Sequence, residues 1–131
     1  MTEQTLFPAP TVDPETEEFW NATREGILLV RHCKSCESAH YYPRTICPHC
    51  GSDDTYFEQA SGKGTIYSYS VMRRAKVPYA LAYVTLEGTD ISMMTNIIDC
   101  NLDDLTVGQS VKLKFSKTVD SDYQLPTFTP V

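Results

Sequence analysis

The sequence predicts a mainly β protein, and three observations lead to this prediction. Two C-x-x-C pairs, Cys33/Cys36 and Cys47/Cys50, are separated by ten residues. From residue 65 onward, apolar and polar residues alternate with the period of a β-strand. A helix-start signal precedes both features. We therefore expect an N-terminal helix, a rubredoxin-like zinc ribbon and a C-terminal five-stranded OB-fold barrel. The expected boundaries are residues 1–26 for the arm and helix, 27–60 for the ribbon and 61–131 for the barrel.

The N-terminal region begins with an arm and continues into a short helix. Residues 1–12 contain two prolines and predict an extended arm with no fold of its own. Asp13, Pro14 and Glu15 are typical of a helix start, with a capping residue, a proline at the first position and an acid in the first turn. We expect the helix to run to Glu25 and to end at the glycine that follows.

The helix carries an aromatic pair, Phe19 and Trp20, among otherwise mostly polar residues. Two interpretations stay open at this point. The pair packs on the ribbon or barrel of the same chain, or it contacts a partner, because Trp and Phe are enriched at the centres of protein interfaces.

The four cysteines are the most specific motif in the chain. Two residues between the cysteines of each pair let both sulfurs reach one ion, and two such pairs supply the four thiolates of a tetrahedral zinc site. Cys33, Cys36, Cys47 and Cys50 are therefore the predicted ligands of a structural Zn²⁺.

Other uses of these cysteines are possible but less favoured. Disulfides would imply a secreted context, and no secretory signal precedes them; a thioredoxin-like redox site would use one pair in a βαβ pattern. Iron in the same four-sulfur cage is the minor variant. Four thiolates fill the coordination shell, so His32, His40 and His49 are expected to be bystanders.

The sequence predicts strands in both the ribbon and the barrel. In the ribbon we expect strands at residues 27–32, 41–42 and 55–59, with a boundary at residues 62–64. In the barrel we expect five strands at 65–73, 79–87, 91–99, 110–119 and 124–128, and a connecting turn within 101–107. Five strands in about 65 residues are too few for a two-sheet sandwich and fit a small closed barrel.

Composition limits the class of partner. The 131 residues carry a formal net charge of −6 and are 41% hydrophobic. An acidic chain argues against binding to nucleic acid or anionic lipid, which depends on clustered positive charge. No apolar run reaches the length of a membrane span, and the first ten residues lack a secretory signal. We therefore expect a cytoplasmic protein.

The ordered set of motifs resembles one known family. It comprises Phe-Trp on a capped helix, C-x-x-C, Tyr-Pro-Arg, C-P-x-C-G, Gly-x-Gly-Thr-Ile-Tyr-Ser and a final Leu-Pro-Thr-Phe-Thr-Pro. This set is similar to the acyl-CoA-associated zinc-ribbon and OB-fold proteins, long catalogued as a domain of unknown function. Two departures are visible: Glu37 replaces a usual glycine, and Tyr42 replaces the first proline of a Pro-Pro-Arg motif. Neither removes a metal ligand.

The resemblance implies a role as a partner subunit. Members of the family look like accessory chains of thiolases, thiolase-like aldolases and hydratases that act on CoA thioesters, in hetero-oligomers with the CoA at or near the interface. The catalytic residues then belong to the other chain.

An active site within the chain itself is not expected. Cys100 is the only thiol not assigned to metal, and it is expected to be a buried apolar residue. All three histidines lie in the ribbon, far in sequence from that thiol. We therefore predict no catalysis by the isolated chain.

One cluster of cations is a candidate site for the phosphates of CoA. Arg73, Arg74 and Lys76, with Lys63 expected nearby, offer groups that suit phosphate oxygens. The alternative is a solvated loop between the first two barrel strands.

Two further functions remain as alternatives to the accessory subunit. OB-folds also bind single-stranded nucleic acid, but the aromatic residues here have few basic neighbours. A rubredoxin-like electron carrier would hold iron at the same cysteines.

Overall fold

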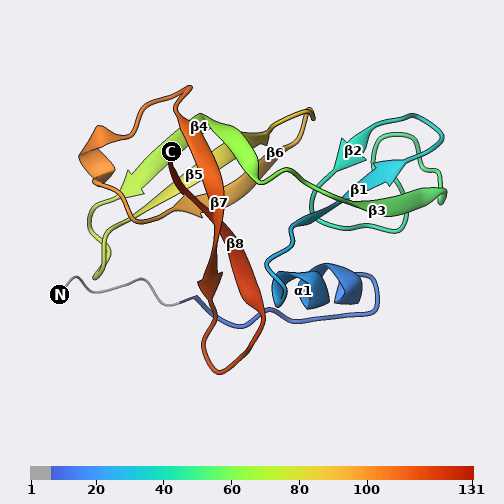
Figure 1. The fold of residues 1–131 in the computed structure, drawn as a ribbon, viewed down its shortest axis with the longest axis horizontal. Helices are drawn as coiled ribbons and strands as arrows, with labels where there is room; N and C mark the ends of the chain where they lie inside the picture. Colours follow the sequence, from blue (N-terminus) through green and yellow to red (C-terminus); the bar gives the residue numbers. More distant parts are fainter. Residues whose placement is uncertain (1–6) are drawn as a thin grey trace.

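The computed structural model describes residues 7–131, which form a small three-stranded sheet, a closed barrel and one α-helix that packs against both (Figure 1). This confirms the predicted mainly β fold with an N-terminal helix and a five-stranded barrel. The elements run in the order α1 (Glu17–Thr23), β1 (Leu29–Cys33), β2 (Ala39–His40), β3 (Thr55–Gln59), β4 (Lys63–Met72), β5 (Tyr79–Leu86), β6 (Ser92–Ile97), η1 (Leu102–Asp104), β7 (Ser110–Lys117) and β8 (Gln124–Pro130).

Helix α1 begins one turn later than the sequence predicts. Asp13 accepts a hydrogen bond from the backbone N–H of Thr16 at 3.0 Å, but residues 14–16 form a separate turn. The Thr16 hydroxyl also donates to the Asp13 carboxylate at 3.0 Å, so these local bonds close a turn before the helix starts. The helix ends at Thr23, two residues before the predicted Glu25. Gly26 does take the left-handed backbone expected of a cap, with φ of +76°, and its N–H reaches the carbonyl of Thr23 at 3.1 Å.

Phe19 and Trp20 are core residues of this chain, with 0% and 5% of their surface exposed. The Phe19 ring meets the rings of Tyr41 and Tyr42 at centroid distances of 5.8 and 5.7 Å. Trp20 donates its Nε1–H to the Tyr42 hydroxyl at 3.0 Å and contacts the ring of Tyr123 beside the barrel. Packing within the chain is therefore the correct interpretation. The expectation that these two side chains contact a partner is corrected, because their rings are already covered.

The ribbon sheet has the strand order β2-β1-β3, and both pairings are antiparallel. The predicted strand at 55–59 is confirmed. The return strand lies at Ala39–His40 rather than at 41–42, because Tyr41 and Tyr42 leave the sheet to pack around Phe19.

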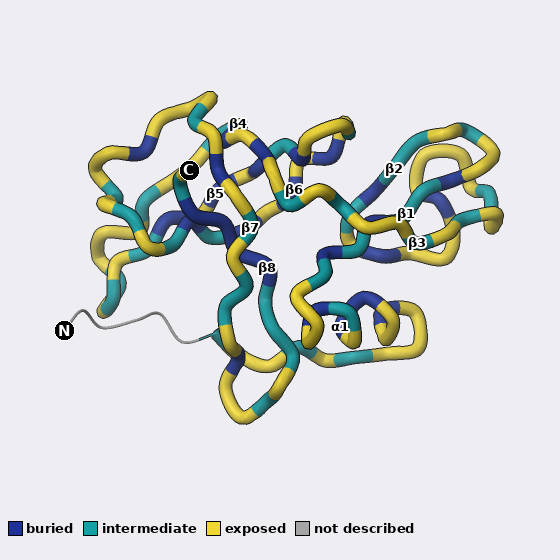
Figure 2. Tube along the Cα trace, viewed as in Figure 1, coloured by how far each residue is buried: buried dark blue, intermediate teal, exposed yellow. Residues whose placement is uncertain are grey.

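The barrel closes in the order β4-β5-β6-β8-β7. All neighbours are antiparallel except β6 and β8, which meet in parallel at Ile97 and Phe128. Along β5, Ala80, Ala82 and Val84 are buried while the residues between them face outward. This confirms the predicted alternation, and Figure 2 shows it along the barrel strands. The five predicted strands are all present, and η1 supplies the turn expected within 101–107.

The arm before the helix lies along the barrel without regular structure of its own. Phe7 forms a parallel bridge with Thr118, and its carbonyl accepts a hydrogen bond from Val119 N–H at 2.9 Å. The part of the predicted arm at residues 1–6 lies outside the described residues.

Candidate metal centre and barrel groove

The two C-x-x-C turns share one backbone geometry. In the first turn, the Cys33 N–H donates to the Ser38 carbonyl at 3.0 Å and the Glu37 N–H donates to the Cys33 carbonyl at 3.0 Å. The equivalent bonds from Cys47 and Gly51 in the second turn measure 2.8 and 2.9 Å. Both turns therefore direct their cysteines inward in the same way.

The four sulfur atoms form one compact group in which every pair lies within 4.8 Å. The Sγ atoms of Cys33 and Cys50 are 3.6 Å apart, and those of Cys36 and Cys47 are 3.7 Å apart. Sulfurs at about 2.3 Å from a tetrahedral zinc ion lie about 3.8 Å from one another. All five cysteines are free, so the disulfide alternative is wrong. The donors present fit a tetrahedral ion bound by four thiolates.

The electrostatics of the cluster favour a bound cation. The backbone N–H of Ser38 is the largest influence on Cys36 and lowers the pKa of that thiol to about 6. The N–H of Ser52 acts in the same direction on Cys50, but burial and the three neighbouring thiols together raise its pKa to about 12. Four sulfurs at this spacing therefore do not all lose their protons unless a positive ion compensates the charge.

None of the three histidines belongs to the metal-binding group among residues 7–131. His32 lies 3.2 Å from the carboxylate of Glu58. His40 is buried, and its Nε2 lies 3.3 Å from the backbone nitrogen of Arg44. His49 is exposed. These positions agree with the expectation that the histidines are bystanders.

The cations predicted to bind phosphate do not all lie together. Arg73, Arg74 and Lys76 are exposed in the connection between β4 and β5, whereas Lys63 is the first residue of β4, at its other end. An extended strand rises about 3.3 Å per residue, so about 30 Å of strand separates Lys63 from the cluster. The inclusion of Lys63 is therefore corrected. Arg73 forms an ion pair with Asp103 of η1 at 2.8 Å. Among the described residues, Arg74 and Lys76 form no ion pair, so they are the two cations of the cluster that stay available to a phosphate.

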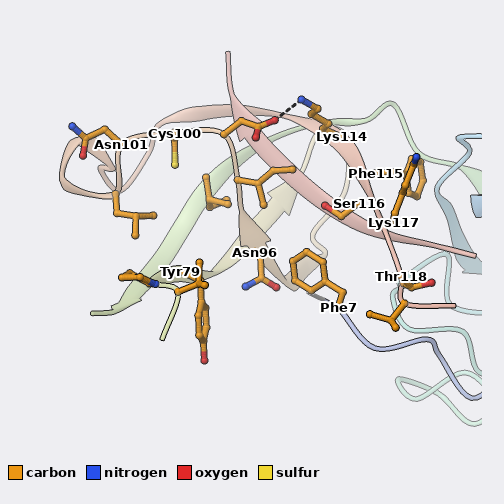
Figure 3. Close-up of a pocket in the computed structure, with 17 residues that line it drawn as sticks. Phe7, Tyr79, Asn96, Cys100, Asn101, Lys114, Phe115, Ser116, Lys117 and Thr118 are labelled. Atoms are coloured by element: carbon orange, nitrogen blue, oxygen red, sulfur yellow. Dashed lines mark hydrogen bonds and ion pairs between the residues drawn. The ribbon is translucent and has the colours of Figure 1, made fainter. Parts of the chain in front are cut away.

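A groove of about 1040 Å³ opens beside this cluster (Figure 3). Its lining comes from the arm, the β4–β5 connection, β6 with the loop after it, and β7. Phe7, Tyr79, Asn96 and Phe115 lie around it, and an ion pair joins Lys114 to Asp99 at its edge. The groove therefore combines apolar rings with a few polar groups, as small-molecule sites do.

Sequence reasoning found only one edge of this groove. Pro78 and Tyr79 follow the cation cluster in the sequence and do line it. Phe7, Asn96 and Phe115 are far apart in the sequence, and only the closure of the barrel brings them together.

Cys100 lines the same groove but is not an activated nucleophile. Burial is the largest influence on this half-buried thiol and raises its pKa, and the carboxylates of Asp99 and Asp104 act in the same direction. No histidine is among the described residues that line the groove. A thiol whose pKa is raised, with no histidine beside it, is not activated as a nucleophile.

Within the part of the chain that the structure describes, no helix has the length and apolar character needed to cross a membrane.

Comparison with protein families identifies both parts of the chain. Residues 20–55 match the family described as "ChsH2, rubredoxin-like zinc ribbon domain", and residues 57–116 match "ChsH2, C-terminal OB-fold domain".

Comparison with individual proteins gives relatives of two kinds. A "DUF35 domain-containing scaffold protein" of Methanocaldococcus jannaschii is 33% identical over 75% of this chain and 74% of its own length. A "Probable enoyl-CoA hydratase alpha subunit" of Thermomonospora curvata is 32% identical over 98% of this chain. The match covers 43% of that relative, so this chain spans less than half of its length.

Among solved structures, a chain of the "Ltp2-ChsH2(DUF35) aldolase" has a TM-score of 0.78 and 28% identity. The match covers 93% of this chain and 98% of that chain.

Proposed function

The chain belongs to the ChsH2 (DUF35) family of zinc-ribbon and OB-fold proteins, and from this premise we propose that it is a non-catalytic accessory subunit of an enzyme complex acting on CoA thioesters. The observation that carries the proposal is the similarity over nearly the full length to a chain of an aldolase structure. The name of the Methanocaldococcus jannaschii relative, "DUF35 domain-containing scaffold protein", supports the same role. The partner is then an enzyme of the aldolase, thiolase-like or hydratase class.

The metal in this proposal is zinc, held by Cys33, Cys36, Cys47 and Cys50. Bound zinc supplies cross-linking rather than reaction chemistry, because four thiolates leave no open coordination position. The two turns hold the sulfurs in place, and β1 together with the rings of Tyr41 and Tyr42 packs the ribbon against α1. Cysteines that serve as metal ligands must stay reduced, and the cytosol keeps thiols reduced. For this reason we propose that the complex is cytoplasmic.

The CoA thioester in this proposal lies at the end of the barrel where β4 passes into β5. Arg74 and Lys76 are exposed there and attract the phosphates, while Arg73 is partly neutralised by Asp103. Pro78 and Tyr79 extend from these cations into the groove, which offers apolar contacts to the rest of the CoA. This arrangement supports a binding role that the partner enzyme completes.

Native purification tests the accessory role. The tagged chain is expressed at its natural level in the source organism, and the proteins that elute with it are identified. We expect an aldolase-, thiolase- or hydratase-type enzyme in stoichiometric amount, and the activity on CoA thioesters should depend on both chains. Activity of the isolated chain on such thioesters, or elution without any enzyme, would contradict the proposal.

A further inference from the structure

Apart from Lys63, the first residue of β4, the outward surface of β4, β5 and β6 carries no charged residue. No Asp, Glu, Lys or Arg occurs in residues 64–72, 79–86 or 91–98, although 21% of the whole chain is charged. We call this surface the charge-free face. Its outward residues include Thr65, Tyr67, Ser68, Ser70, Met72, Leu81, Tyr83, Thr85, Ser92, Met94 and Asn96.

The strand register places the large side chains of this face next to one another. Ser68 pairs with Tyr83, which pairs in turn with Met94, so the three lie in one row across the strands. Tyr67 stands beside this row at the bulge in β4. The exposed fractions are 67% for Tyr67, 53% for Met94 and 43% for Tyr83. Three large side chains of this kind lie uncovered on a β-sheet whose inner side is already packed.

Charged groups stand only at the ends of the charge-free face. Arg74 and Lys76 lie in the β4–β5 connection at one end. At the other end lie Glu87 and Asp90 in the β5–β6 turn, with Lys63 at the start of β4. Depletion of charge at the centre, exposed Tyr and Met, and charge at the rim are the organisation of a protein–protein interface.

The chemistry of the face selects the kind of occupant. Single-stranded nucleic acid needs cations among the stacking aromatics, and this face has none. A second copy of the chain would bring another net charge of −6, and only the few charged groups at the two ends of the face would offset that repulsion. A protein surface that is itself poor in charge suits the face, because no charge on either side is then buried unpaired.

We infer that the charge-free face is the surface on which the partner enzyme subunit docks, through a charge-poor patch of its own. This inference rests on the proposed accessory function and specifies where the contact lies. The cations at one end of the face are exposed in the connection that also lines the groove, so a CoA thioester held there would lie at the edge of the interface.

The test uses the enzyme that co-purifies with the wild-type chain, purified and titrated against variants of the full chain. Met94→Glu and Met94→Lys place charges of opposite sign at the centre of the face, and Tyr67→Lys is a second, more exposed position. Ile46→Lys on the ribbon and Val107→Glu on a barrel loop are matched controls, since both residues are exposed and apolar but lie outside the face. Unchanged metal content and melting temperature show that each variant folds.

We expect both Met94 variants to weaken the complex at least about tenfold, because either charge would be buried without a partner. The controls should bind like the wild-type chain. If the enzyme binds the Met94 and Tyr67 variants as tightly as wild type, the inference is overturned while the accessory function stands. A homodimer of the isolated chain that Met94→Glu dissociates, or binding of a labelled oligothymidylate that Tyr67→Lys changes, overturns it as well. If no enzyme co-purifies, the accessory function itself fails.

Discussion

Glu37 and Gly51 occupy the same position in the two cysteine turns, and both have a left-handed backbone, with φ of +61° and +81°. A side chain in this conformation places its Cβ too close to the following carbonyl, whereas glycine adopts it without penalty. Glu37→Gly should therefore raise the free energy of unfolding of the metal-loaded protein by about 0.5–1 kcal/mol. Denaturant unfolding followed by circular dichroism measures this change.

Glu37→Ala is the control that separates the backbone from the charge. It removes the carboxylate but keeps a Cβ, so it should not stabilise the protein. Equal stabilisation by Ala and Gly would show that the backbone account is mistaken. Gly51→Ala, the reverse change in the second turn, should destabilise by about 1 kcal/mol.

Loss of one thiolate should release the metal. In Cys47→Ser only three sulfurs remain near the ion, and since structural metal binding is coupled to folding, residues 27–60 should lose protection against hydrogen exchange. Elemental analysis gives the metal content and also distinguishes zinc from iron. Cys100→Ser is the matched control, because this thiol lies outside the cluster and should leave the metal in place. A Cys47→Ser protein with full metal and an unchanged melting curve would disprove the metal site.

Thr23, which is itself buried, joins helix α1 to the barrel through hydrogen bonds with Gln124. Its hydroxyl accepts the N–H of Gln124 at 3.1 Å and donates to the carbonyl of Trp20 at 2.6 Å. Thr23→Val keeps the shape but leaves the Gln124 N–H without this acceptor, so it should cost about 1–3 kcal/mol in the free energy of unfolding. Thr106→Val, at an exposed position, should change stability by less than about 0.5 kcal/mol. Similar values for the two variants would contradict the proposed link.

The parts of this molecule that sequence reasoning placed correctly are those governed by local rules. The alternation along β5 indicated its inward and outward sides, and Gly26 has the left-handed backbone expected of it after the helix. The beginning of the helix was misplaced because Asp13 and Thr16 bond to each other and close a separate turn. That choice between two local hydrogen-bond patterns is not visible in residue types alone.

The features that the sequence did not predict are made by segments that lie far apart in the sequence. The groove needs Phe7 and Phe115 on one side of a closed barrel, and no local pattern relates them. Lys63 was expected near Arg73 by composition, but β4 separates them by its full length. The charge-free face did leave a signal, the absence of charge in residues 64–72, 79–86 and 91–98. That signal becomes meaningful only when the register shows that the strands share one surface.

His40 should make the stability of the ribbon depend on pH. Burial is the largest influence on this ring and lowers its pKa below the usual 6.5. The unfolded chain then binds a proton near pH 6.5 that the folded chain does not accept until lower pH. The free energy of unfolding should therefore fall as the pH drops from about 6.5 toward the folded pKa, by at most about 1.4 kcal/mol per pH unit.

Two variants isolate this contribution. His40→Phe removes the titrating group and should reduce the slope of stability against pH between pH 7 and 5.5. His49→Gln changes an exposed histidine whose charge acts on His40 less than burial does, so it should retain most of the wild-type slope. All three proteins keep the four cysteine ligands, so the loss of slope specific to His40→Phe reports on His40, and identical slopes for His40→Phe and wild type would refute the assignment.

Arg74 and Lys76 should contribute to CoA affinity in the assembled complex through charge. Both are exposed beside the groove, and neither is in an ion pair among the described residues. Reversing both charges with Arg74→Glu and Lys76→Glu should raise KM for the CoA thioester at least about tenfold and leave kcat nearly unchanged, because phosphate contacts far from the reacting atoms act on binding. The effect should shrink at high ionic strength, where exposed charges are screened.

Lys63→Glu makes the same kind of change at the other end of β4 and should leave KM unaltered. An equal rise in KM from Lys63→Glu would indicate that net charge, rather than a local phosphate site, governs the affinity.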